Sequence, residues 1–145
     1  MTVNTAQSRG YEQRWAAARQ TSDEVRQNWG TQRPLDHAHL ARYTLGDKAL
    51  ELEILDLFLD EAPHTLNRLE TLAACIPCDA KAWVVGCHTL KGSAWAVGAF
   101  GVAAAAERAE MERDLLPALL QEHVRAMGES LGAVSTYIAA WRVKP

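Results

Sequence analysis

The sequence is poor in the features that mark several classes of protein. Its 145 residues include three cysteines, an odd number and too few for a disulfide framework. No run approaches the roughly 18 apolar residues of a membrane-spanning helix, and the first residues lack the apolar segment of a signal peptide. The formal net charge of −3 gives no broad basic field for a nucleic-acid backbone. We therefore expect a cytoplasmic protein with reduced thiols that binds neither membranes nor nucleic acids.

β-Branched residues are also few, whereas alanine and leucine are abundant. The composition is 48% hydrophobic and 23% charged, which favours globular helical structure over sheet or disorder. A chain of this length can bury one core without disulfides or metal. The sequence therefore predicts an all-α protein.

The balance of charge changes near Pro34. Residues 1–34 contain five arginines and three acidic residues, a balance of +2, whereas residues 35–145 sum to −5. The apolar periodicity of the first part is poor. We predict an N-terminal extension over residues 1–34, either disordered or partly helical, and a folded domain over residues 35–145.

Signals for helix ends divide this domain into one short helix and four long ones. They comprise expected N-caps at Asp36, Asp47 and Asp79, expected stops at Gly46 and Gly98, and a proline suited to a first turn at Pro117. Pro63 is expected to kink or split the first long helix, because proline lacks a backbone donor. Short links between long helices predict an antiparallel up-and-down four-helix bundle, preceded by the short helix.

His88 occupies an unusual stretch, "CHTLKGSAWAVGA", on the second long helix. At about 100° per residue, Val84, Lys91, Gly92 and Trp95 fall within about 60° of His88. The opposite side carries an apolar stripe made of Trp83, Gly86, Cys87, Leu90, Ala94 and Val97. We therefore expect His88 to point away from the core.

The neighbours of His88 suit a transferring phosphoryl group. Gly92 costs a helix roughly 1 kcal/mol relative to alanine, and it leaves open space beside the imidazole. Lys91 is expected to extend an ammonium over that space as a partly exposed cation, and Ser93 adds a hydroxyl. An exposed nucleophilic ring, an approach groove and a cation together favour phosphoryl transfer through His88.

The segment "HTLKGSAWAVGA" closely resembles the H-x-L-K-G-S/A…G-A signature of histidine-containing phosphotransfer (HPt) domains, the relay modules of two-component signalling. The resemblance covers roughly residues 36–142. "LGDKALELEILDLFLDEAPHTLNRLETLAA" is similar to the preceding helix of that family, Pro63 included, and Glu110 stands where members often carry Glu or Gln. The resemblance implies that His88 accepts the phosphoryl group, that Lys91 is the phosphate-side cation and that Gly92 provides clearance. The remaining residues near the phosphate or the docking surface would be Val84, Ser93, Trp95 and Glu110.

The resemblance also implies partners. These would be response-regulator receiver domains, a hybrid sensor kinase or both, with Mg²⁺ supplied by the receiver and no cofactor or metal of the chain's own. Neither a P-loop nor a Gly-rich nucleotide motif occurs, so we expect a monomeric phosphoryl carrier, not a kinase. An exposed imidazole is largely neutral at cytoplasmic pH, as the attack requires. Trp95 departs from the family by replacing a small residue, and Cys87 replaces a common alanine and should pack coreward.

Two other functions remain as alternatives. The chain could be a helical adaptor that binds a receiver or kinase without accepting phosphate. A metal or redox bundle could instead be built on "CIPC", Cys75 and Cys78, whose spacing is typical of redox and zinc pairs. His37 and His39 lie two residues apart on a short helix, so they should face different directions and not share a metal.

Overall fold

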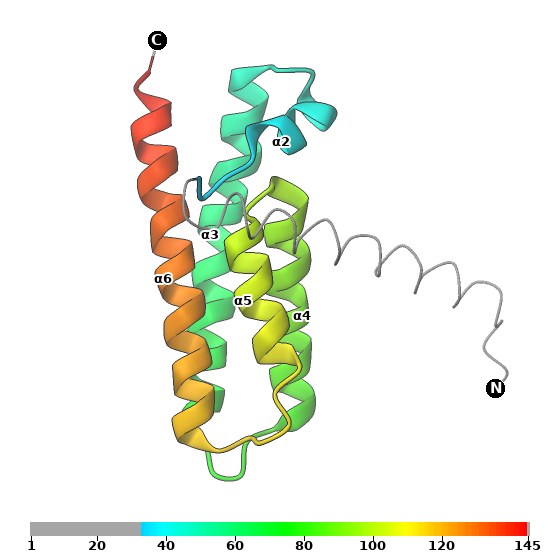
Figure 1. Ribbon diagram of the computed structural model, residues 1–145, viewed down its shortest axis with the longest axis vertical. Coiled ribbons are helices and arrows are strands. Elements are labelled where there is room, and N and C mark those ends of the chain that lie inside the picture. Colours follow the sequence, from blue (N-terminus) through cyan, green and yellow to red (C-terminus); the bar gives the residue numbers. More distant parts are fainter. Residues whose placement is uncertain (1–32, 145) are drawn as a thin grey trace, which may run out of the picture.

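A computed structural model describes residues 33–144. These residues form helices and no strand: α2 (His37–Thr44), α3 (Lys48–Ala74), α4 (Ala80–Val97), α5 (Phe100–Glu110) and α6 (Pro117–Arg142). The four longer helices run alternately up and down, and α2 packs at the end of the bundle where α6 terminates (Figure 1). The all-α prediction and the bundle with its short preceding helix are confirmed. The predicted extension, residues 1–34, lies outside the described residues except for its last two.

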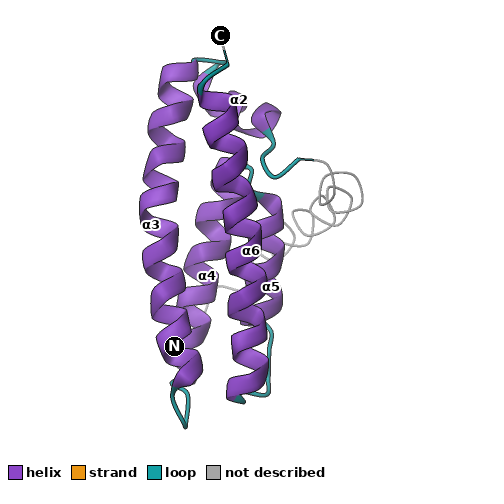
Figure 2. Ribbon diagram, turned by 90° about the vertical axis from the view of Figure 1, so that its left-hand side faces the viewer, coloured by secondary structure: helices purple, strands orange, loops and turns teal. Residues whose placement is uncertain are grey.

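The four long helices close a ring. Each contacts the next in the chain, and α3 also contacts α6 (Figure 2). The core is filled by buried apolar side chains from every helix and by Leu35, which precedes α2. The largest from the helices are Trp83, Leu40, Leu55, Leu69, Leu90, Leu120, Met127 and Ile138. In α5 an alanine run, residues 103–106, is buried, and these small side chains let α5 approach its neighbours closely.

Local capping chemistry sets the helix boundaries. The carboxylate of Asp36 accepts a hydrogen bond from the backbone of α2, that of Asp47 from α3 and that of Asp79 from α4, so the three predicted N-caps are confirmed. Pro117 begins α6, where its missing N–H costs nothing. None of the described helices has the length and apolar character needed to span a bilayer.

Pro63 does not split its helix. α3 continues through this residue as one 27-residue element. The helix buries Phe58, Ala62, Thr65 and Leu69 on both sides of the proline. This packing offsets the roughly 3 kcal/mol that a proline costs in a helix interior. Of the two expected outcomes, the split was wrong and the kink stays a prediction.

Two glycines allow close approaches that position the second long helix. At Gly86 an added Cβ would lie 2.7 Å from Cδ2 of Leu69, so α3 and α4 can pack this tightly only without a side chain there. Gly98 ends α4 with a φ of 84°, and an added Cβ would lie 2.7 Å from the carbonyl oxygen of Asp36. The Asp36 N–H donates to the Gly98 carbonyl at 3.0 Å, which fastens the start of α2 to the end of α4.

Candidate functional site

His88 projects from the outer face of α4, as the helical periodicity predicts. Its side chain is 53% exposed. The opposite face carries the predicted stripe, in which Gly86 is half-buried and the buried members are Trp83, Cys87, Leu90, Ala94 and Val97. The imidazole therefore reaches solvent while the helix that carries it is anchored in the core.

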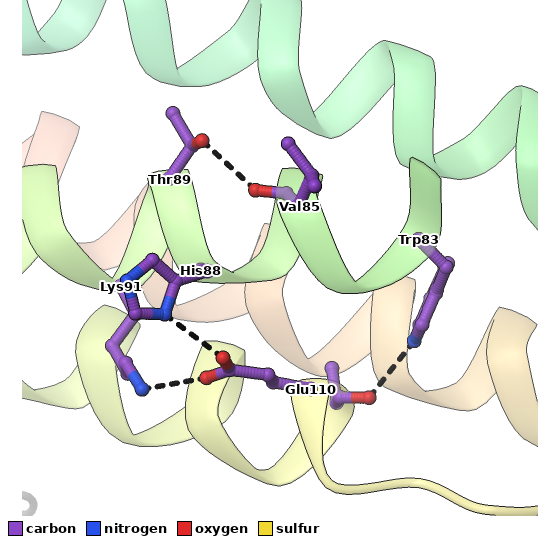
Figure 3. A network of polar contacts seen from close by, with 7 residues as sticks. Trp83, Val85, His88, Thr89, Lys91 and Glu110 are labelled. Carbon is purple, nitrogen blue, oxygen red and sulfur yellow. Dashed lines mark hydrogen bonds and ion pairs between the residues drawn. The ribbon is translucent and has the colours of Figure 1, made fainter. Parts of the chain in front are cut away.

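A single carboxylate connects His88 to Lys91. Oε1 of Glu110 lies 2.9 Å from Nδ1 of His88, and Oε2 of the same group lies 2.6 Å from Nζ of Lys91 (Figure 3). The Glu110 side chain is 18% exposed and that of Lys91 is 12% exposed. The three side chains form a charged cluster between α4 and α5, with the imidazole on its solvent side.

Trp83 holds the end of α5 in place. Its indole is fully buried, and Nε1 donates a hydrogen bond to the carbonyl of Ala109 at 2.8 Å (Figure 3). Glu110 is the next residue and the last of α5. A core side chain of α4 thus fixes the backbone from which the carboxylate reaches back to the same helix.

The surroundings of Glu110 keep it ionised. Burial alone would raise the pKa of its carboxyl, but the hydrogen bonds and charges of Lys91 and His88 outweigh burial and hold that pKa below its ordinary value. A carboxylate only accepts hydrogen bonds. In the neutral ring the proton must therefore lie on Nδ1, which leaves the lone pair on Nε2, the nitrogen farther from Glu110.

Lys91 differs from its expected placement. The sequence predicts a partly exposed ammonium over the space beside Gly92, whereas the structure pairs the ammonium with Glu110 and buries most of the side chain. The reason is that α5 lies on the Lys91 side of α4 and presents a carboxylate there. The cation is thus held one helical turn from the imidazole, on the side away from Gly92.

The surface at Gly92 is open. A Cβ built on this residue would meet no atom within 4 Å outside its own helix. Among residues 33–144 the missing side chain therefore relieves no contact, in contrast to Gly86 and Gly98. The predicted role of Gly92 in clearance stays a prediction.

The other predicted site residues lie farther from this cluster or bind elsewhere. The hydroxyl of Ser93 donates to the carbonyl of Thr89 at 3.0 Å, a bond that includes no member of the cluster. Trp95 is half-buried, with its ring centroid 4.6 Å from that of Phe100. Val84 is 42% exposed, one turn before His88. The roles of these three residues stay predictions.

An apolar groove of about 480 Å³ runs between α3 and α4. Val85 and Thr89 line it from α4, and Leu69, Leu72 and Arg68 from α3. Val85 is 56% exposed, and it points away from Glu110 (Figure 3). Lys91 and Glu110 therefore lie on one side of His88, and the apolar groove lies on the other.

The cysteines offer no comparable chemistry. Sγ of Cys75 donates to the carbonyl of Thr71 at 3.3 Å. Burial raises the pKa of the Cys78 thiol, and it raises that of Cys87 to about 12, so neither is activated as a thiolate. Within residues 33–144 no three or more His, Cys, Asp or Glu residues are grouped so as to hold a metal ion.

Sequence reasoning placed Glu110 near the site but missed its contacts. Glu110 is 22 residues from His88 and 19 from Lys91, so both contacts depend on how α4 and α5 align. The spacing of His88 and Lys91 contained a signal for this contact. Residues three apart lie on the same face of a helix, so one acceptor can hydrogen-bond to both side chains.

Comparison with known families agrees with this geometry. The family model described as Hpt domain matches residues 53–139, more than half of the chain, and it includes α4, α5 and the whole charged cluster. The comparisons with curated proteins and with solved structures found no match. Hpt domains are phosphotransfer carriers of two-component signalling and not enzymes with a catalytic site of their own. The fold, the histidine motif and the family match lead to one conclusion: the chain belongs to the Hpt domain family.

Proposed function

We propose that the chain relays a phosphoryl group between aspartates of receiver domains through a phosphohistidine at His88. The observation that carries this proposal is the hydrogen bond between Nδ1 of His88 and Glu110, because it leaves the nucleophilic lone pair on Nε2 of a ring that is 53% exposed. The exposed imidazole and the open surface at Gly92 support access by a second protein.

Every bond made or broken in the transfer belongs to the imidazole or to the acyl phosphate. Nε2 attacks the phosphorus of a receiver's aspartyl phosphate, so an N–P bond forms while the O–P bond to the aspartate breaks and the carboxylate leaves. The ring keeps its Nδ1 proton and becomes cationic. Glu110 stabilises that charge through the hydrogen bond it already makes, and the reverse sequence delivers the group to another aspartate.

Lys91 supports the same step from the other oxygen of Glu110. Its ammonium offsets the charge of the carboxylate before transfer, and because both groups contact the same carboxylate, the ammonium would also attract the incoming phosphoryl oxygens. The receiver supplies the Mg²⁺ of the reaction. A monomeric, cytoplasmic carrier without a cofactor of its own fits this role.

The receiver would dock across α4 on the side away from Glu110. Gly92 lies about 40° around the helix from His88 on that side, and Val85 and Thr89 lead from it into the groove with α3. An apolar groove beside a polar reactive centre is a surface that a partner protein can cover.

Incubation with a panel of phosphorylated receiver domains tests the proposal. We expect the chain to take up acid-labile, alkali-stable phosphate, and His88→Gln to lose this uptake while keeping its helical content. His64→Gln is the matched control, because His64 is also an exposed histidine on a long helix. Uptake that persists in His88→Gln contradicts the site. Receiver binding by the wild type without any uptake would favour the adaptor.

A further inference from the structure

Two histidines of the short helix α2 pack against the bundle beside the buried side chains of Leu35 and Leu40. The ring of His37 packs on α6, with centroid distances of 4.5 Å to Trp141 and 5.4 Å to Tyr137. The ring of His39 faces the other way and packs 5.1 Å from Phe100 of α5 and 6.3 Å from Trp95 of α4. The predicted divergence of the two rings is confirmed, and each inserts between aromatic side chains.

Ring nitrogens of both histidines are buried. Nδ1 and Nε2 of His37 and Nε2 of His39 are inaccessible to solvent and have no hydrogen-bond partner in the part of the chain that the structure describes. A neutral imidazole tolerates such a site at a moderate cost. An imidazolium needs acceptors or water at both nitrogens, so its burial here costs much more.

We propose that His37 and His39 form a pH-sensitive latch, which holds α2 on the bundle while both rings are neutral and releases it when they are protonated. The latch does not depend on phosphoryl transfer, and it would exist in a chain that never accepts phosphate. Its release would uncover the Trp95–Phe100 pair, in which Trp95 lies on α4, the helix that carries His88.

Charged groups around the latch act in both directions. Carboxylates that favour a cation and cations that oppose it come from α3, from α2 and from the residues before α2: Glu51 and Lys48 on α3, Asp36 and Arg33 before α2, and Arg42 on α2. α6 presents Tyr137 as its titratable group, and α5 presents the uncharged ring of Phe100. α4 presents the ring of Trp95 and the backbone carbonyls of Trp95 and Ala96, which act to raise the pKa of His39. The buried carboxylate of Glu51 accepts a hydrogen bond from the Thr44 hydroxyl at 2.9 Å. Burial of the rings outweighs the carboxylates and, at His39, the two backbone carbonyls, and it lowers the pKa of both histidines.

The direction of the pH effect follows from linkage. When α2 is detached, both histidines titrate near the ordinary value of 6.5, whereas docking lowers their pKa. The detached form therefore binds more protons below about pH 6.5, and docking weakens as the pH falls. Each histidine can change the docking equilibrium by up to about tenfold per pH unit between its two pKa values.

Amide hydrogen exchange of the full chain, followed by NMR at pH 7.5 and pH 5 and corrected for intrinsic exchange, tests the latch. We expect protection in α2 to fall at least about tenfold on acidification relative to the centre of α6. The double variant His37→Phe, His39→Phe should keep α2 protected at both values. His64→Phe, which alters an exposed histidine of α3, should behave as the wild type does.

Several results would overturn the proposal. One is protection in wild-type α2 that is constant or that rises in acid, since a rise would mean that protonated His37 pairs with Glu51. Another is a loss of α2 protection at pH 5 that also occurs in the double variant. A ring titration of the unaltered chain gives an answer even if the double variant does not fold: pKa values below 6.5 for His37 and His39 support the latch, and values at or above 6.5 contradict it.

Discussion

The imidazole of His88 and the imidazoles of α2 sit in opposite environments. His88 is about half exposed and has a carboxylate at 2.9 Å from Nδ1, so its surroundings accept a positive charge on the ring. The rings of His37 and His39 lie among aromatic side chains with nitrogens that lack partners among residues 33–144, so their surroundings oppose that charge. The same side chain packs among aromatic rings in α2, whereas at His88 we propose that it acts as a nucleophile. The difference lies in the neighbours and not in helical position.

The largest effect is expected from filling the space beside His88. Gly92→Gln places a long side chain one turn from the imidazole, and it should reduce phosphoryl transfer by roughly a hundredfold because in-line approach depends on position. Gly92→Ala is the control, because its Cβ meets no neighbouring atom. Both variants should unfold at equal or higher urea concentration, since both improve helix propensity by up to about 1 kcal/mol. If the transfer time course of Gly92→Gln matched that of the wild type, the open space beside His88 would not be needed for transfer.

Removing the ammonium of Lys91 should have the second-largest effect. Lys91→Ala leaves Glu110 with the imidazole as its remaining partner in the cluster. We expect transfer about tenfold slower and a shorter phosphohistidine lifetime, because hydrogen bonds to charged groups contribute about 1.5 to 3 kcal/mol. Receiver affinity, measured by titration beside the time course, should change little. Affinity lost in proportion to rate would mean that Lys91 acts in docking.

A substitution in α2 should change the stability of the protein without changing phosphoryl transfer. His37→Phe keeps a ring against Trp141 and removes two buried nitrogens that lack partners among the described residues. The free energy of unfolding at pH 7.5 should rise by up to about 1 kcal/mol, since replacing an unsatisfied polar group with an apolar one of similar shape is neutral or stabilising. Transfer should match that of the wild type. A loss of more than about 1 kcal/mol would show that the ring nitrogens have partners.

The smallest effect is the pH dependence that Glu110 contributes to stability. Its pKa is lower in the folded chain than the ordinary 4.5, so its contribution is complete above about pH 4.5 and is lost as the pH falls through the folded value. Partial exposure limits this contribution to about 1 kcal/mol or less. The free energies of unfolding of the wild type and of Glu110→Gln, measured by urea titration, should therefore differ by a constant amount well above pH 4.5 and converge as the pH falls below 4.5. Curves that stay parallel would indicate that the carboxyl gains nothing from its two partners.

The elements that local chemistry decides could be predicted from the sequence. Asp36, Asp47 and Asp79 cap helices through bonds to residues two or three positions away, and the apolar stripe of α4 fixes the direction of His88. Pro63 was harder, because the packing that carries α3 through it comes from other helices.

The contacts that depend on alignment between helices could not be predicted. Glu110 reaches His88 and Lys91 only because α5 returns beside α4 with its last residue at the right height. The same holds for His37, which meets an aromatic pair about a hundred residues later in the chain. Periodicity shows which face of a helix is apolar, but it does not show which residue of another helix contacts that face.

The central claim is that Glu110 holds the proton on Nδ1 and leaves Nε2 of His88 as the phosphoryl acceptor. The most direct test is ¹⁵N NMR of the chain labelled at its histidine ring nitrogens, recorded after phosphorylation by a receiver domain. The account predicts a single phosphohistidine, at His88, with phosphorus bound to Nε2 and the proton retained on Nδ1. Phosphorus on Nδ1 of His88, or on any other histidine, would contradict it.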